Sequence, residues 1–117
     1  MTPRDQTIQD VVERLKAYEP ESVVLFGSHA RGDAHEDSDL DILIVKRTTQ
    51  RRPERLDEVL NLIYPGKQFD IWPRQGVDVL VYTPEELRQR YELGDFFVKR
   101  IVREGRVLYG KQPLAAR

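Results

Sequence analysis

Short apolar runs alternate with amphipathic helical segments along the chain, and this order constrains the fold more than any other feature. The runs Ser22–Phe26, Asp39–Val45 and Val77–Tyr82 are of the kind found in buried strands. Apolar residues at helical spacing lie before, between and after them. This alternation favours an α/β (α+β) fold, a small mixed β-sheet with helices packed on it.

Helix signals stand between the strands. Two stretches, Thr2–Asp5 and Thr83–Glu86, read as capping boxes with proline at the first helical position, and predict helices that reach about Tyr18 and Leu93. A helical turn from 28 to 31, a helix between 53 and 65 and a helical stripe before 105 are also expected. Short strands are expected around 69–72 and at 107–109.

The size and charge of the chain exclude several classes of protein. A length of 117 residues predicts one domain, residues 1–117. Because 19 Lys and Arg stand against 20 Asp and Glu, we expect no extended nucleic-acid binding, which needs a cationic face. No window resembles a membrane span and the N-terminus lacks the apolar core of a signal peptide, so we expect a soluble, cytoplasmic protein without a membrane partner. Homo-oligomer formation is left open.

Gly27 and Ser28 stand where a strand passes into a helix. The backbone N–H groups at such a helix start point outward and can hold an anion, most naturally a phosphate. Glycine lets a ligand approach the backbone closely, and the Ser28 hydroxyl adds a donor. Alone, a Gly-Ser pair is usually an ordinary turn, so the interpretation depends on the acidic residues that follow.

Three aspartates are candidates for binding metal ions. Asp39 and Asp41 are two apart on a strand, so both carboxylates point to one face. Asp78 lies near the start of another strand, where a buried, unpaired carboxylate would be costly. If the two strands are neighbours, the three carboxylates converge and suffice for two divalent ions, and Mg²⁺ prefers such oxygen ligands beside a phosphate.

The stretch Gly27-Ser28, ten residues, Asp39-Leu40-Asp41 resembles the signature of the nucleotidyltransferase superfamily that includes DNA polymerase β. The surrounding Phe-Gly-Ser-x-Ala-Arg-Gly pattern, the strand around Asp78 and the Glu104–Tyr109 ending resemble the minimal nucleotidyltransferases in particular. The resemblance spans most of the chain. It implies the nucleotidyltransferase fold and the transfer of a nucleoside monophosphate from a nucleoside triphosphate, with pyrophosphate leaving.

The resemblance also implies roles for the matching residues. Gly27 and Ser28 would hold the triphosphate of ATP, and Arg31 could pair with its terminal oxygens. Asp39 and Asp41 would bind two Mg²⁺ ions as catalytic residues, and Asp78 would complete the ion that activates the acceptor hydroxyl. Minimal members are often antitoxins that attach AMP to a tyrosine of a HEPN-type toxin. Because the toxin motif Arg-x4-His-x-Tyr is absent from this sequence, any such toxin is a separate chain.

Three functions compete on this basis. The first is a Mg²⁺-dependent protein adenylyltransferase that acts as the antitoxin of a toxin–antitoxin pair. The second is the same chemistry on a small molecule such as an aminoglycoside, which a chain of this length has little material to recognise. The third is a binding module for a nucleotide or partner that keeps the fold without turnover, which the complete set of acidic residues disfavours.

Other polar and aromatic residues are assigned structural roles. His29 and His35 are expected on the surface rather than as ligands. Four arginines are interpreted as a solvated face, with contact to a partner or to the triphosphate as the alternative: Arg47, Arg51, Arg52 and Arg55. Core or helix packing is expected for three aromatic residues, with an exposed partner contact as the alternative: Trp72, Phe96 and Phe97.

Overall fold

Helices and strands alternate in the computed structural model, which describes residues 3–35, 38–65 and 76–114. The elements, in chain order, are α1 (Pro3–Leu15), the 3₁₀ helix η1 (Lys16–Tyr18), β1 (Ser22–Phe26), α2 (Ser28–Arg31), β2 (Leu40–Val45), α3 (Arg52–Ile63), β3 (Val77–Tyr82), α4 (Pro84–Glu92), α5 (Phe96–Glu104) and β4 (Arg106–Gly110). The α/β fold predicted from the sequence is confirmed. The expected capping residue Thr2 and the expected strand at 69–72 lie outside the described residues.

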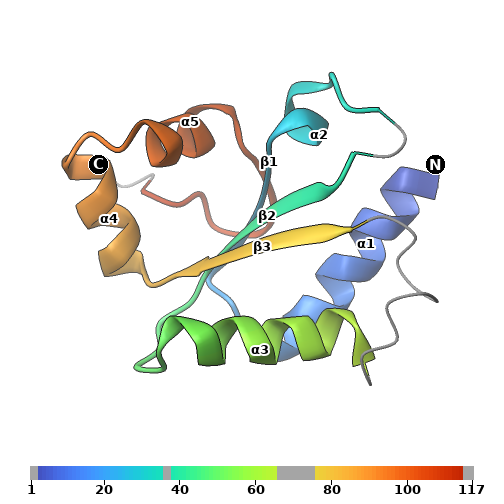
Figure 1. Cartoon of the computed structure of the whole chain (residues 1–117), viewed down its shortest axis with the longest axis horizontal. Helices are drawn as coiled ribbons and strands as arrows, with labels where there is room; N and C mark the ends of the chain where they lie inside the picture. The colour runs from blue at the N-terminus through green and yellow to red at the C-terminus, as the bar shows by residue number, and fades with distance from the viewer. Residues whose placement is uncertain (1–2, 36–37, 66–75, 115–117) are drawn as a thin grey trace.

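The strands form one mixed sheet in the order β3-β2-β1-β4. β1 is antiparallel to both β2 and β4, whereas β2 and β3 run parallel (Figure 1). A parallel pair needs a crossover connection, and α3 provides it between β2 and β3. The parallel register places the starts of β2 and β3 side by side, and this positions the site described below.

Helices lie on both faces of the sheet, and the two central strands β1 and β2 are buried along nearly their whole length (Figure 1). On one face α1 and α3 pack against the sheet, and the shared core contains Leu15, Leu25, Ile42, Ile63 and Val81. On the other face α4 and α5 pack against Val24, Leu43, Val45 and Tyr82 through Leu87, Val98 and Ile101. Burial of each such aliphatic side chain stabilises the fold by roughly 1.5–3 kcal/mol.

The ends of the helices follow from their capping residues. Thr83 accepts a hydrogen bond from the Glu86 N–H at 3.1 Å, and the Glu86 carboxylate accepts one from the Thr83 N–H at 2.8 Å, so the predicted capping box of α4 is confirmed. At α5 the Asp95 carboxylate accepts from the N–H groups of Phe97 and Val98. The first helix stops at Leu15 rather than Tyr18, and η1 continues it. Among the described residues, none of the helices combines the length and the apolar character that a bilayer span requires.

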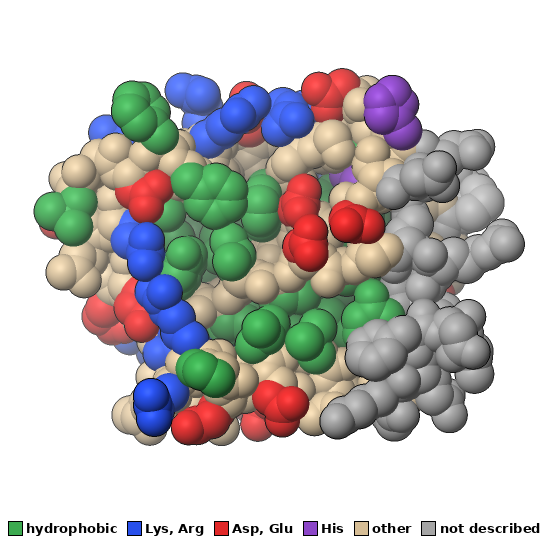
Figure 2. Space-filling model, in the orientation of Figure 1, with side chains coloured by type: hydrophobic (Ala, Val, Ile, Leu, Met, Phe, Trp, Pro, Cys, Tyr) green, Lys and Arg blue, Asp and Glu red, His purple; other side chains and the backbone are tan. Residues whose placement is uncertain are grey.

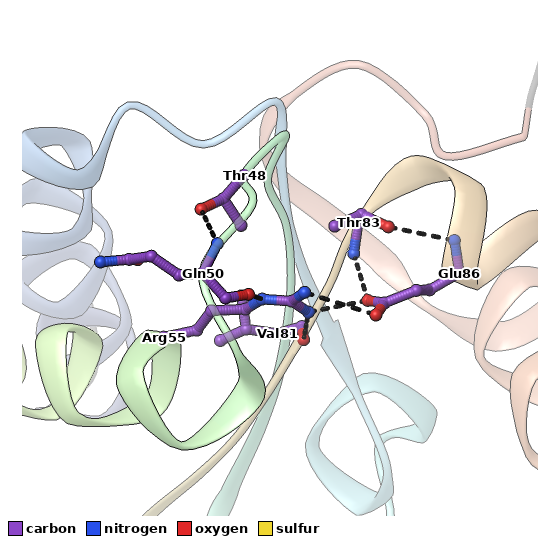
Figure 3. Close-up of polar contacts among 6 residues, drawn as sticks. All are labelled: Thr48, Gln50, Arg55, Val81, Thr83 and Glu86. Carbon is purple, nitrogen blue, oxygen red and sulfur yellow. Dashed lines mark hydrogen bonds and ion pairs between the residues drawn. The ribbon is translucent and has the colours of Figure 1, made fainter.

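A buried ion pair joins α3, β3 and α4. The Arg55 side chain is 7% exposed and donates to Glu86 Oε1 at 2.7 Å, to the Gln50 carbonyl at 2.8 Å and to the Val81 carbonyl at 3.3 Å (Figure 3). The interpretation of Arg55 as solvated is therefore wrong. One turn of α3 places it against the sheet, and two of its partners, Val81 and Glu86, are distant in sequence. Arg47, Arg51 and Arg52 are exposed, as expected.

Burial disfavours the ionised form of Glu86, but hydrogen bonds from Arg55 and from the Thr83 N–H outweigh burial and lower the pKa of Glu86 below its ordinary 4.5. A lowered carboxyl pKa stabilises the fold above the unfolded-state pKa, and this contribution disappears as the pH falls through the lowered value. The ion pair should therefore stabilise the protein at neutral pH and cease to do so in acid.

We expect Glu86→Gln to lower the free energy of unfolding at pH 7 by about 1–2 kcal/mol, because it leaves the buried Arg55 guanidinium without its counter-charge. Urea denaturation at several pH values measures this, and the difference from wild type should shrink as the pH falls from 4.5 through the lowered pKa of Glu86. Glu85→Gln is the matched control, since Glu85 is 72% exposed and its ion pair is with the exposed Arg47. Equal effects of the two variants would contradict the role given to the buried pair.

Candidate active site

The parallel pairing of β2 and β3 places Asp41 directly opposite Asp78. Their strand neighbours Leu40, Ile42 and Val77 belong to the core on the α1 and α3 side. Because side chains alternate along a strand, both carboxylates point to the opposite face, toward α5. The predicted adjacency of the two acidic strands is thus confirmed.

Gly27 follows β1 and lies against the Asp41 carboxylate. Phe26 pairs with Asp41 across the antiparallel ladder, and the chain then turns at Gly27 with φ 74° and ψ −155°, a conformation that is essentially restricted to glycine. A Cβ at Gly27 would overlap Asp41 Oδ2. Glycine is therefore required here twice, by the backbone conformation and by the close carboxylate.

A second glycine has the same relation to Asp39. A Cβ at Gly76 would lie 2.6 Å from Asp39 Oδ1, and the Gly76 carbonyl accepts a hydrogen bond from the Leu40 N–H at 2.9 Å. Asp39, just before β2, and Asp41, within it, therefore each lie against a glycine backbone. This leaves room around both carboxylates that a larger side chain would occupy.

A pocket of about 320 Å³ opens beside the Asp41–Asp78 pair. Its lining combines apolar side chains with charged ones at the ends: Phe26, Gly27, Arg31, Asp41, Asp78, Leu80, Phe97, Arg100, Ile101 and Glu104. Figure 2 shows this face, where an apolar patch adjoins a group of acidic side chains and Lys and Arg side chains lie along the upper edge. A larger hollow between α1 and β4 is lined by neither Gly27 nor the Asp41–Asp78 pair.

Negative charge accumulates at this end of the sheet. Burial raises the pKa of Asp41, the charges of Asp78 and Asp39 raise it further, and His29 and Arg31 lower it. A cation between the carboxylates would relieve this repulsion, and hard oxygen ligands suit Mg²⁺. Within residues 3–35, 38–65 and 76–114, no group of three His, Cys, Asp or Glu side chains is already arranged around a metal position. Metal binding by Asp39, Asp41 and Asp78 remains a prediction.

The structure brings together four of the six residues predicted for the site. Gly27, Arg31, Asp41 and Asp78 all line the pocket. Asp39 immediately precedes β2, is exposed and acts on Asp41 through its charge, without lining the pocket. Ser28 is the first residue of α2, beside Gly27 but outside the lining.

His29 is buried, so the prediction that it lies on the surface is wrong. Its ring is 9% exposed, and Nε2 donates to the Ser38 carbonyl at 2.9 Å. Within the part of the chain that is described, Nδ1 is buried and has no hydrogen-bond partner. The bond fastens α2 to the segment just before Asp39, across nine residues of sequence. His35 is exposed, as predicted.

Helix α5 supplies one wall of the pocket, which the sequence did not indicate. Phe97 packs edge-to-face on Phe26 with ring centroids 5.6 Å apart, and Arg100 pairs with Glu104 at 2.9 Å. The available signal was helical spacing, because 97, 100, 101 and 104 share one side of a helix. The prediction of core packing is wrong for Phe96, whose residue surface is 90% exposed. Phe97 is half-buried, with 48% of its surface exposed.

A family model described as a nucleotidyltransferase domain matches residues 5–109. The chain belongs to the nucleotidyltransferase domain family. The fold class and the enzyme class inferred from the Gly27, Asp39 and Asp41 pattern are therefore confirmed. In this nucleotidyltransferase the residues of that pattern come from the end of β1 and the start of β2.

Known proteins similar to this nucleotidyltransferase include a Methanocaldococcus jannaschii protein whose name marks it as a candidate protein adenylyltransferase. It is 31% identical over 108 residues, which cover 90% of this chain and 97% of the relative. A crystal structure of a toxin–antitoxin with AMP-PNP shares the fold, with a TM-score of 0.56 and 23% identity over 90% of this chain and 74% of that one. Spectinomycin adenyltransferase from Enterococcus faecialis, solved with ATP and spectinomycin, has a TM-score of 0.60 and 16% identity over 91% and 56% of the chains.

We expect Gly27→Ala to abolish nucleotide transfer and to lower the free energy of unfolding by about 2–4 kcal/mol, because a Cβ there is strained and overlaps the Asp41 carboxylate. Gly32→Ala is the matched control. Gly32 also has a positive φ of 83°, but nothing lies within 4 Å of its added Cβ. It should lose only about 1 kcal/mol and keep its activity. Similar losses in both variants, measured by urea denaturation, would contradict the close approach of Gly27 to Asp41.

We expect Asp41→Asn to stabilise the protein at pH 7 in the absence of divalent cations, because it removes repulsion from Asp78 and Asp39. Because folding raises the pKa of Asp41, this carboxyl favours the folded state below its unfolded-state pKa of 3.8. That contribution is lost as the pH rises through the folded-state pKa. The gain should be on the order of 0.5 kcal/mol after solvent screening. Thermal unfolding should show the gain in stability at pH 7 and not in acid. Asp57→Asn, at an exposed position of α3, is the control.

Proposed function

We propose that this nucleotidyltransferase transfers AMP from ATP to a hydroxyl of a separate protein, a tyrosine of a cognate HEPN-type toxin, and thereby acts as an antitoxin in the cytoplasm. The observation that carries the proposal is the placement of Asp41 opposite Asp78 on parallel strands, with Gly27 against Asp41. The nearness of a glycine backbone to paired carboxylates supports the proposal, because phosphoryl transfer can use backbone N–H groups to bind phosphate and carboxylates to hold metal ions.

Asp39, Asp41 and Asp78 are the residues that would hold two Mg²⁺ ions. Their oxygen donors and their mutual repulsion fit hard divalent cations. Such ions, when bound, neutralise phosphate charge and lower the pKa of an acceptor hydroxyl. Asp41 and Asp78 come from two neighbouring strands, so the sheet itself fixes the separation of these two carboxylates.

The remaining residues bind and orient the substrate. Gly27 leaves its backbone open to a phosphate, and the Ser28 hydroxyl lies next to it as a donor. Arg31 is one helical turn further and lines the same pocket, where it can pair with phosphate oxygens. Phe26, Leu80 and Phe97 exclude water from one side of the pocket, which strengthens the electrostatic interactions inside it.

Two findings support a protein acceptor. The 31% identical relative carries a name for protein adenylyl transfer, and a similar solved structure is a toxin–antitoxin. The pocket of about 320 Å³ is also at the small end of the range for small-molecule sites. A pocket that accommodates the nucleotide has little volume left for an acceptor, so the acceptor would approach as part of a larger surface.

We expect ATP labelled at its α-phosphate to transfer label to a co-purified HEPN-type protein when Mg²⁺ is present. Asp41→Asn and Asp78→Asn should each reduce transfer by at least about a hundredfold, because each removes a carboxylate that would hold Mg²⁺ at the reacting phosphate. Asp57→Asn on α3 is the control and should transfer normally. Label can be followed on a denaturing gel, and tyrosine attachment by mass spectrometry.

Two results would refute the mechanism: undiminished transfer in both site variants, or label that moves only from the γ-phosphate. Aminoglycosides as acceptors provide the comparison with the small-molecule alternative. Transfer to an aminoglycoside, with none to any protein, would replace the proposed acceptor while leaving the site intact. Binding of ATP without transfer to either acceptor class would favour the non-catalytic module.

A further inference from the structure

The outer side of α5 exposes aromatic and basic side chains beside the active-site pocket. Phe96 is 90% exposed, Phe97 is 48% exposed, and Leu93, just before the helix, is 78% exposed. We use the term α5 surface for these residues and the helix's cations: Leu93, Phe96, Phe97, Lys99, Arg100 and Arg103. Adjacent exposed apolar side chains of this size are typical of interaction sites.

The same surface carries positive charge in a chain whose net charge is −1. Helical spacing places Phe96, Lys99 and Arg103 on one side of α5, and all three are exposed. Arg100 is already paired with Glu104 at 2.9 Å, whereas Lys99 and Arg103 form no salt bridge within the described part of the chain. Lys99 Nζ lies 5.5 Å from the Tyr91 ring centroid, a contact that helps to hold it in place. The charge complement of this surface is an acidic partner.

The α5 surface is continuous with the pocket. Phe97 belongs to both, because its exposed ring also packs on Phe26 and lines the pocket with Asp41. A polypeptide lying along α5 would therefore reach the Asp41–Asp78 pair without a gap.

We propose that the α5 surface docks the acceptor protein, and that the acceptor presents its hydroxyl in an acidic segment that carries an apolar side chain. This inference rests on the proposed transfer to a protein hydroxyl. The exposed phenyl rings provide the apolar anchor, and Lys99 and Arg103 select acidic over basic sequences. Single-stranded RNA also binds aromatic and basic surfaces. The two cations Lys99 and Arg103 would neutralise few phosphates, so an acidic polypeptide is the better match.

Binding can be measured without any turnover. The probe is a fluorescein-labelled peptide with one tyrosine flanked by glutamates and leucines, and its affinity is measured by fluorescence anisotropy with AMP-PNP and Mg²⁺ present. We expect the wild-type protein to bind it at least about tenfold more tightly than a peptide in which lysine replaces each glutamate. Phe96→Ser and the double variant Lys99→Glu/Arg103→Glu should each weaken binding by about tenfold or more.

Two matched controls separate docking from general effects of charge and exposure. Arg88→Glu/Lys111→Glu makes the same charge change in a hollow beside Ser22 and Val45, at the other end of the sheet. Leu56→Ser removes an exposed leucine from α3. Both controls should bind the acidic peptide as the wild type does. All variants should keep wild-type affinity for AMP-PNP, because none of the changed residues lines the active-site pocket.

The outcomes distinguish this inference from the proposed function. Equal binding of the two peptides, no binding of either, or binding that is unchanged in the α5 variants would overturn the docking surface. Tighter binding of an oligouridine RNA at the α5 surface would assign it to nucleic acid instead. Labelled transfer to the acidic peptide tests the chemistry separately, because a peptide that binds but receives no AMP would count against the protein hydroxyl as acceptor and not against the surface.

Discussion

The parallel pairing of β2 with β3 sets two carboxylates side by side at one end of the sheet. These like charges repel each other, and the rest of the fold offsets the repulsion. Asp41 faces Asp78 in the register, and the raised pKa of Asp41 reports the electrostatic cost. Directly behind them, Leu40 and Ile42 are fully buried, and each contributes roughly 1.5–3 kcal/mol. The apolar strands can therefore hold a charge arrangement that would otherwise separate, and a bound cation would turn the same arrangement into an attraction.

The register of β2 is what makes this pairing specific. A slip by one residue would turn Asp41 toward the core between α1 and α3, because alternate side chains point to opposite faces. The second half of the strand is apolar on both faces, so it tolerates either register, and the acidic residues at the start decide between them. At the other end of β3 the bond from Arg55 to the Val81 carbonyl and the ion pair with Glu86 fix the strand against α3 and α4.

Sequence patterns predicted what depends on local spacing and missed what depends on distant partners. Apolar periodicity and capping residues indicated the strands and helices, and the alternation along β2 placed Asp41 on the face opposite to Leu40 and Ile42. The burial of Arg55 depends on Glu86, 31 residues away, and that of His29 depends on how the loop to Ser38 folds back. Core packing was the wrong expectation for Phe96, because its neighbours at helical spacing, Lys99 and Arg103, are charged and this side of α5 faces outward. Polar pairing between remote segments leaves no periodic signal in a single sequence.

The helix α5 shows how a short chain combines several tasks in one element. Val98 and Ile101 close the core against the sheet, Phe97 and Arg100 line the pocket, and Phe96 with Lys99 faces outward. A helix of nine residues has only about two and a half turns, so each of these sides holds only a few residues. Any movement of α5 that widens the pocket must also move the outward surface. Contact with a partner on that surface would therefore bear on the pocket wall itself, through the Phe97 ring that belongs to both.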